Sequence, residues 1–366
     1  MWFSRKTQKN SNELALDACQ AKLNSIHSDG VQLSLAELLQ YQTKSALINL
    51  TAKKNIHGKQ SGNYLSRSKG RGMEFDEVRH YQVGDDTRAI DWRVTARTGK
   101  THTKLFREEI ERPVLIATDL SSSMRFGSQL LFKSVQAAHL AALVAWHAKG
   151  RGDRIGGLVF SNNQHIELKP RSRKTGVLHY LHALTQLNNN SSNNSAPLNN
   201  NLDNVSDAQA NKTQKKPVTD FADHCARLRQ LAKPGSLVYV ITDGHSLLNN
   251  ENKQQDALRH LMRIAQHCEL VVCLINDPLE LSLPETSRKI TATLTDGTNR
   301  QQLTLGDKST AFNYHRQATA QNDAKKQALV EIGARVIDFS AGESLEQQLK
   351  NNSSHLSHSN TQAVNS

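Results

Sequence analysis

Residues 114–124 read Val114-Leu115-Ile116-Ala117-Thr118-Asp119-Leu120-Ser121-Ser122-Ser123-Met124. The first four residues are all apolar, without the polar alternation of a half-exposed strand, as expected for a strand buried on both faces. The strand ends in the pattern Asp-x-Ser-x-Ser, and a helix-like segment follows. Ligands of open α/β sheets bind in the crevice beyond the carboxyl ends of the strands. This stretch therefore predicts a buried parallel strand and, directly after it, a polar site.

Outward from this stretch, strand-length apolar runs alternate with helical segments from residue 112 to residue 350. We expect strands at 113–119, 154–160, 236–242, 270–275 and 334–339, and helices at 130–149, 177–187, 256–266, 311–332 and 343–350. Such alternation is typical of a parallel sheet covered by helices on both faces. The predicted fold class is α/β, with a Rossmann-like, doubly wound, mostly parallel sheet and an N-terminal helical and β extension.

The rest of the chain divides by composition. Residues 1–50 form a helical segment, in which Ser34 and Glu37 make a capping box that opens a helical run to about residue 50. Residues 51–111 are a separate basic segment, and residues 112–350 are the α/β domain. Within that domain, 188–217 are rich in Asn, Ser and Lys and predict a disordered insertion. Two short runs at 290–294 and 301–305 predict a hairpin, and the polar tail 351–366 is expected to be disordered.

Composition limits the class of protein. With 37% hydrophobic and 22% charged residues over 366 positions, the chain can fill a large core, which excludes a small disulfide-stapled or fibrous class. No window has the roughly 18 uninterrupted apolar residues of a membrane helix. The four cysteines contain no C-x-x-C pair, which disfavours a disulfide scaffold or a cysteine zinc site. We therefore expect a cytoplasmic protein.

The net charge of +12 is unevenly distributed, because residues 51–107 hold 13 lysines and arginines against 6 acidic residues. Such a basic surface is either a solvated face, a site for an acidic protein partner or anionic lipid, or a nucleic-acid site. The stretch 53–71 could neutralise phosphates. Tyr64 is the only aromatic residue in it, so base stacking is poorly supplied and nucleic-acid binding is the weaker alternative.

Oxygen-bearing side chains follow two of the expected strands. Asp119, Ser121 and Ser123 come after the first, and Asp243 comes after the strand ending at residue 242. Thr175, which opens the 177–187 helix, is the candidate for a fifth ligand by its position alone. An all-oxygen set favours a hard cation, Mg²⁺ with Mn²⁺ or Ca²⁺ as substitutes. The competing interpretation is a helix N-cap whose serines satisfy backbone donors.

With these residues the chain resembles the von Willebrand factor type A fold, whose metal ion-dependent adhesion site uses Asp-x-Ser-x-Ser, a later Thr and a later Asp. The segments 70–79 and 81–97, which contain Gly84-Asp85-Asp86 and Asp91-Trp92-Arg93, resemble the signature of the bacterial domain of unknown function 58 proteins. Proteins of that family are typically encoded beside MoxR-type AAA+ ATPases. The resemblance, over about 65–345, implies a metal-dependent adaptor that works with such an ATPase in protein maturation or complex remodelling, and binds an acidic ligand whose carboxylate reaches the metal.

The signature segment also mixes planar cations with a large ring, in Arg88, Trp92, Arg93 and Arg97. Two interpretations remain open. These residues either pack the segment onto the sheet through ion pairs, or form a recognition surface for an acidic partner, since Trp and Arg are common anchors of interfaces.

Catalysis is not required by any motif. The sequence contains no G-x-S-x-G, no G-x-x-x-x-G-K-[ST] and no H-E-x-x-H. A Mg²⁺-dependent hydrolase with Asp119 as nucleophile would need a second acid nearby, and Ser121 stands where that acid would be useful. We therefore expect a binding protein and keep a hydrolase as a lesser alternative.

Overall fold

The computed structural model describes residues 11–47, 73–108, 111–193, 220–247, 251–284, 290–295 and 300–351. The basic stretch 53–71, residues 194–217 of the expected insertion, the turn at 296–297 and the tail from 352 lie outside the described residues. The chain divides into two units. One contains residues 1–49 and 112–366, and the other contains residues 50–111.

The larger unit is built on a six-stranded sheet with the order β10-β7-β6-β3-β4-β5. Its strands are β3 (Pro113–Asp119), β4 (Arg154–Phe160), β5 (His165–Arg171), β6 (Leu237–Thr242), β7 (Glu269–Asn276) and β10 (Arg335–Ser340). All neighbours are parallel except β4 and β5. Every residue of β6 is buried, as the absence of polar alternation predicts. The mostly parallel, Rossmann-like α/β sheet is therefore confirmed.

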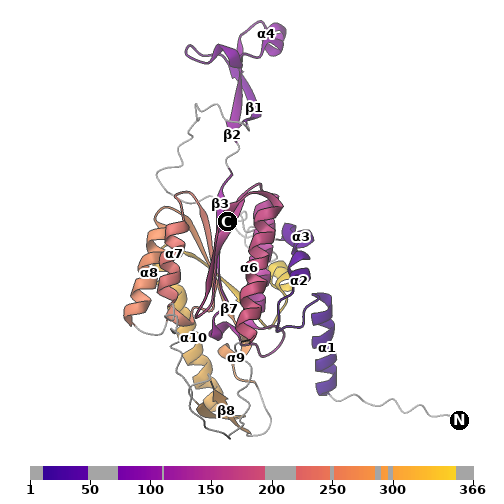
Figure 1. Ribbon diagram of the computed structural model, residues 1–366, viewed down its shortest axis with the longest axis vertical. Helices are drawn as coiled ribbons and strands as arrows, with labels where there is room; N and C mark the ends of the chain where they lie inside the picture. The colour runs from indigo at the N-terminus through magenta and orange to yellow at the C-terminus, as the bar shows by residue number, and fades with distance from the viewer. Residues whose placement is uncertain are drawn as a thin grey trace, which may run out of the picture. The chain divides into compact units, whose positions relative to one another are not determined.

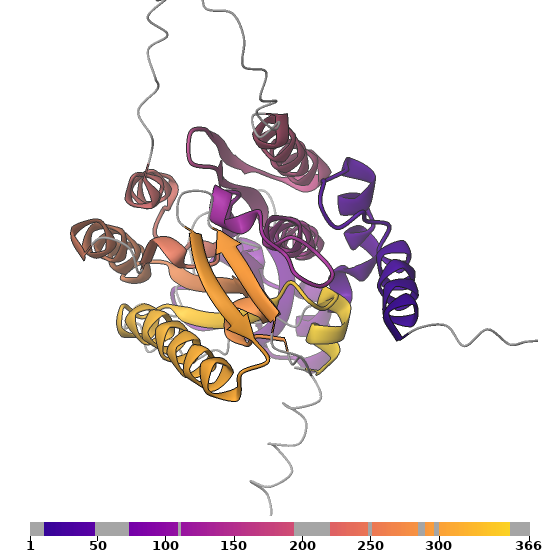
Figure 2. The same ribbon diagram turned by 90° about the horizontal axis from the view of Figure 1, so that it is seen from below.

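Helices cover both faces of this sheet (Figures 1 and 2). One face packs against α5 (Lys133–Gly150) and α6 (Arg173–Asn193), and the other against α7 (Phe221–Leu231), α8 (Glu251–Ala265) and α10 (Lys308–Glu331). Alternate residues of β3 serve the two faces. Leu115 and Ala117 join the core under α7 and α8, whereas Thr118 hydrogen-bonds Tyr180 of α6. Both faces of the strand are thus occupied, and no solvent face remains for polar side chains.

The N-terminal residues pack onto α5. The capping box of Ser34 and Glu37 is present and begins α2 (Leu35–Leu39). The expected helical run is present in three pieces, because α2 is followed by α3 (Tyr41–Lys44) and by a 3-10 turn, η1 (Ser45–Leu47), and residues 48–50 lie outside the described residues. Before them lies α1 (Ser11–Ser25). Helices this short depend on tertiary packing, which Glu37 provides through its buried hydrogen bond to His139 of α5.

Three segments of the larger unit differ from the sequence prediction. Strand β5, which pairs antiparallel with β4, was not predicted. Helix α6 extends to Asn193, so residues 188–193 of the expected disordered insertion are helical, and Asn188 is buried. Helix α7 was not predicted. Its apolar residues Phe221, Cys225 and Leu228 return at helical spacing directly after the Asn-rich stretch.

Smaller elements complete the fold. The expected hairpin is confirmed as β8 (Ile290–Thr295) with β9 (Arg300–Leu305), and the last helix spans 345–351. The short α9 (Pro278–Leu281) follows β7. In the smaller unit, β1 (Met73–His80) and β2 (His102–Glu108) pair antiparallel, with the 3-10 turn η2 (Thr87–Ala89) and α4 (Trp92–Thr98) between them. Among the described residues, no helix is both long and apolar enough to cross a membrane.

Candidate functional site

Asp119 and Asp243 lie together at the carboxyl edge of the sheet. Strands β3 and β6 are neighbours, with Thr118 beside Ile241, and each strand runs directly into its aspartate. A hydrogen bond joins the two turns, because Thr242 Oγ1 donates to Asp119 Oδ2 at 2.8 Å. Both carboxylates are buried, at 2% and 4% exposure. The structure thus brings together two acids that are more than a hundred residues apart in sequence.

The two serines lie on the outer side of these acids. Ser121 N donates to Asp119 Oδ1 at 2.9 Å, and the hydroxyls of Ser121 and Ser123 are 3.2 Å apart. Ser121 precedes the 3-10 turn η3 (Ser122–Met124), but its side chain makes no capping hydrogen bond. This geometry counts against the N-cap interpretation, because the hydroxyl of Ser121, the residue at the N-cap position, accepts no hydrogen bond from a backbone donor of the turn. Both serines are partly exposed, so they are the solvent side of the cluster.

Thr175 does not belong to this cluster, so its expected role as a fifth ligand is wrong. Strand β4 begins at Arg154 beside Pro113, and its second residue pairs with Arg171 near the end of β5. Because β5 runs antiparallel, the residues that follow it lie at the amino edge of β3. A seven-residue strand spans about 20 Å, which separates Thr175 from Asp119. Thr175 is exposed, and its hydroxyl donates to the carbonyl oxygen of Ser172.

The loop at the correct edge offers Asn162 instead. This residue follows β4, and its Oδ1 accepts a hydrogen bond from Ser122 N at 2.7 Å. The expectation of a threonine in this role rested on the order of residues along the chain. The antiparallel β5, which returns the chain to the far edge, was not visible in that order.

Burial and neighbouring charges shift the pKa values of the two acids in opposite directions. Burial and the neighbouring charge of Asp243 raise the pKa of Asp119 to about 6. Burial alone would also raise the pKa of Asp243, but Lys133 and the hydrogen bonds from His245 N and Ser123 lower it below its usual range. At neutral pH Asp243 is therefore readily ionised, whereas the ionised form of Asp119 is disfavoured by burial and by the charge of Asp243. A cation bound near the two serines would stabilise the ionised form of Asp119.

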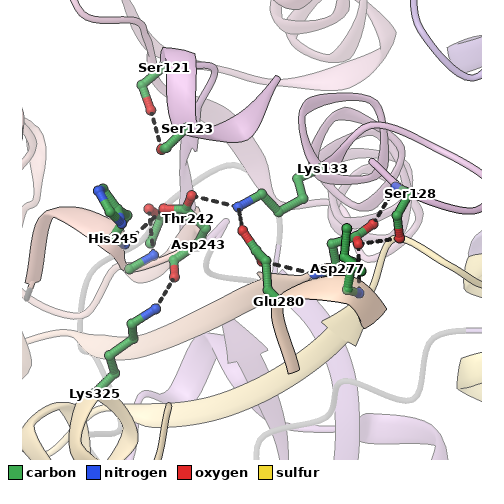
Figure 3. A network of polar contacts seen from close by, with 12 residues as sticks. Ser121, Ser123, Ser128, Lys133, Thr242, Asp243, His245, Asp277, Glu280 and Lys325 are labelled. Atoms are coloured by element: carbon green, nitrogen blue, oxygen red, sulfur yellow. Dashed lines mark hydrogen bonds and ion pairs between the residues drawn. The ribbon is translucent and has the colours of Figure 1, made fainter. Parts of the chain in front are cut away.

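Sequence reasoning missed a set of residues around Asp243 (Figure 3). Lys133 Nζ donates to Asp243 Oδ2 at 2.9 Å and to Glu280 Oε1 at 2.5 Å. Lys325 Nζ donates to the main-chain oxygen of Asp243 at 3.2 Å. A signal for Lys133 does exist in the sequence, since it is the only charged residue between Leu130 and Ala148. A lone charge in such an apolar helix indicates a buried partner.

The donor set fits a hard divalent ion that keeps several waters. In octahedral Mg²⁺ coordination, adjacent oxygens at about 2.1 Å from the ion are about 3 Å apart, close to the 3.2 Å between the hydroxyls of Ser121 and Ser123. No group of three or more histidine, cysteine, aspartate or glutamate residues in the described part of the chain is arranged to hold a metal. Two acids with two hydroxyls would thus form an open site that needs further oxygens from water or from a ligand.

In the smaller unit, the four signature residues Arg88, Trp92, Arg93 and Arg97 are all exposed, with Trp92 at 70%. Two acids of this unit make their hydrogen bonds to nearby residues of the chain. Asp91 caps α4 by accepting from Arg93 N and Val94 N, and Asp85 accepts from Arg79 and from Gln82 N. Gly84 lies in a turn and has a φ of +106°, a backbone conformation that favours glycine.

The fold is thus a mixed α/β, Rossmann-like one, with its polar cluster at the carboxyl edge of the sheet. A family model described as "Protein of unknown function DUF58" matches residues 77–326. This match covers more than half of the chain, and the chain belongs to that family. It includes most of the smaller unit that the structure describes and the sheet as far as β7, together with Asp119, Asp243 and Lys133.

Relatives in mycobacteria share part of this sequence. The "Uncharacterized protein Mb1516" of Mycobacterium bovis and the "Uncharacterized protein Rv1480" of Mycobacterium tuberculosis are each 36% identical over 112 residues. The aligned part is 31% of this chain and 35% of each relative. The chain thus spans about a third of the length of the curated relatives it matches.

Proposed function

We propose that this chain is a divalent-cation-dependent protein-binding module with a von Willebrand factor type A-like domain. Its cation would be Mg²⁺, with Mn²⁺ or Ca²⁺ as substitutes. The observation that carries the proposal is the cluster at the carboxyl edge of the sheet, in which two buried acids lie behind the partly exposed hydroxyls of Ser121 and Ser123. Such a cluster has the oxygen donors of a cation site and an open outer side.

The chain's own residues divide the work of this site. Asp119 and Asp243 supply the negative charge, and the Thr242 hydroxyl and the amides of Ser121 and His245 hold their carboxylates in place. The hydroxyls of Ser121 and Ser123 supply neutral oxygens. A bound divalent ion would supply an electrophilic centre that accepts a carboxylate of an acidic protein ligand. Neutral oxygens suit this role, because they leave the charge of the ion uncompensated on the outer side.

A hydrolase is less well supported by the geometry. Asp119 would have to attack a substrate, yet both of its oxygens accept hydrogen bonds and its side chain is buried. An acid held in this way is suited to be a fixed ligand rather than a nucleophile. The second acid beside it, Asp243, is also buried and is paired with the ammonium group of Lys133, so it is poorly placed to transfer a proton.

The smaller unit offers a second surface for an acidic partner, formed by Arg88, Trp92, Arg93 and Arg97. Arg and Trp anchor many protein interfaces, and the three arginine side chains are exposed. Resemblance to the family named above supports a MoxR-type AAA+ ATPase as the partner, in protein maturation or complex remodelling. Charge reversal at Arg93 and Arg97 should weaken capture of that ATPase, whereas reversal at the exposed Lys174 of α6 should not.

The metal site is tested by the thermal shift that Mg²⁺ or Mn²⁺ produces. We expect a rise in Tm for the parent, because an ion that binds only the folded state stabilises it. The rise should be lost in Asp119→Ala and kept in Asp256→Ala, a surface control on α8 whose side chain is 57% exposed. Equal shifts in the parent and in Asp119→Ala would refute the site. Capture of the ATPase that is unchanged by a chelator would separate the partner from the metal.

A further inference from the structure

Lys133 stands in a place where a lysine is unfavourable by itself. It is the first residue of the 18-residue helix α5, and its side chain is only 2% exposed. The first turn of a helix is the positive end of its dipole, where acidic side chains are favoured and cations are not. Burial of an ammonium group adds a desolvation cost. The partners of Lys133 must therefore account for its presence.

Those partners connect the candidate metal site to a neighbouring acid (Figure 3). Lys133 Nζ lies between Asp243 Oδ2, at 2.9 Å, and Glu280 Oε1, at 2.5 Å. The other oxygen of Asp243 accepts from His245 N. Glu280 belongs to α9 and its side chain is 38% exposed, so it can move more freely than the buried Asp243. A divalent ion that uses Asp243 must therefore share this carboxylate with a resident cation.

We propose that Lys133 is a built-in counter-cation that weakens binding of the divalent ion and strengthens binding of the ligand's carboxylate. This inference rests on the proposed function. Without the ion, the ammonium group neutralises Asp243. With the ion present, the repulsion between the two cations shifts the pairing of Lys133 toward Glu280.

Formal charges explain why Lys133 should strengthen binding of the ligand's carboxylate although it weakens binding of the ion. Asp119, Asp243 and Glu280 are negative, while Lys133 and Lys325 are positive, so a divalent ion leaves the group with a net charge of +1. Without Lys133 the occupied group would be neutral. An incoming carboxylate is attracted to the occupied group with Lys133, which carries a net charge of +1, and not to the neutral group without it. Lys133 thus favours a site that fills when ion and acidic ligand arrive together.

Titration with Mn²⁺, with free ion measured by electron paramagnetic resonance, tests this proposal on the full chain. Lys133→Met should bind Mn²⁺ about tenfold more tightly than the parent, because a nearby positive charge is removed. Glu280→Gln should bind it about threefold more weakly, because Lys133 is then left with Asp243 alone. Lys326→Met removes a surface lysine that pairs with Asp338 and should match the parent.

Acetate then serves as the carboxylate probe. Adding it should tighten Mn²⁺ binding by the parent and have a smaller effect on Lys133→Met. If Lys133 only supported the fold, its replacement would not both tighten Mn²⁺ binding and reduce the effect of acetate. Equal Mn²⁺ affinity of Lys133→Met and the parent, with loss in Asp119→Ala, would overturn the role of Lys133 and leave the metal site standing.

If Lys133→Met does not fold, the Mn²⁺ affinity of Glu280→Gln tests the proposal instead. Mn²⁺ binding by Glu280→Gln as tight as that of the parent would overturn it. Absence of Mn²⁺ binding in the parent would overturn both the metal site and the role of Lys133.

Discussion

The hydroxyl of Thr242 lies 2.8 Å from Asp119 Oδ2 and donates to it across the neighbouring strands β3 and β6. The hydroxyl oxygen of Thr242 also accepts a hydrogen bond from Gly244 N at 3.2 Å. One buried side chain therefore joins the turn after β3 to the turn after β6. It holds the two candidate acids in register even though they repel each other.

Replacing Thr242 by Val should destabilise the fold by about 1–3 kcal/mol, because a buried carboxylate oxygen and a main-chain amide each lose a partner. The free energy of unfolding, measured by urea denaturation, reports the loss. Thr242→Ser keeps the hydroxyl and is the matched control, with a smaller loss from the missing methyl group. A Val variant as stable as the parent would show that the hydrogen bonds of this hydroxyl contribute nothing.

Thr175→Ala should leave the response to divalent ions unchanged, because Thr175 lies at the opposite edge of the sheet from Asp119. Ser123→Ala should reduce that response, since Ser123 supplies one of the two hydroxyls. The Tm shift with Mg²⁺ compares the two variants under identical conditions. A lost shift in Thr175→Ala would contradict the antiparallel register of β4 and β5.

The sheet could be predicted because its signals are local. Apolar runs of strand length predicted β3 and β4 with their observed bounds, and the alternation of strands with helices predicted their parallel arrangement. Strand β5 was missed because its sequence is mostly polar, with Leu168 as the only deeply buried residue of an edge strand. Because β5 was missed, Thr175 was predicted at the wrong edge of the sheet. An antiparallel strand reverses the direction of the chain, so the segment after it begins at the opposite edge.

The site was predictable only in part, for a related reason. Asp119 and Asp243 follow recognisable strands, so their meeting at one edge follows from parallel topology. Lys133 opens the helix after β3 and Glu280 follows β7, so both lie at the same edge, but their sequences do not reveal which side chains they meet there. Their contact depends on how α5 and α9 pack, which is a property of the assembled core rather than of any short motif.

Glu37→Ala should weaken the attachment of the N-terminal helices to α5. Glu37 and His139 are 2% and 1% exposed and hydrogen-bond each other, and Glu37 also accepts from Ser34 N. Loss of both contacts should cost about 1–3 kcal/mol, and hydrogen exchange over residues 26–41 should speed up. Glu346→Ala removes only the partly exposed pair with Lys44 and is the control. Unchanged exchange in Glu37→Ala would mean that apolar packing alone holds this segment.

Protonation of His224 should destabilise the fold in mild acid. This residue of α7 is 3% exposed and stacks on Phe160, and burial together with the neighbouring His165 lowers its pKa to about 4. Arg227 lowers the pKa further, while the main chain of Ser161 and the carboxylate of Asp223 act in the opposite direction.

The unfolded chain has an ordinary histidine pKa of about 6.5, so it binds more protons than the folded chain between pH 6.5 and 4. The stability associated with neutral His224 is therefore complete above pH 6.5 and is lost as the pH falls toward 4, by roughly 3 kcal/mol in total. Asp119 has the opposite effect, because its raised pKa makes stability fall as pH rises between 3.8 and about 6. Comparison with His224→Phe cancels that contribution, since Phe keeps the ring stacking and does not titrate. The difference in unfolding free energy between the parent and His224→Phe should shift against the parent from pH 7 to pH 4.5, and a difference that stays constant would exclude this role for His224.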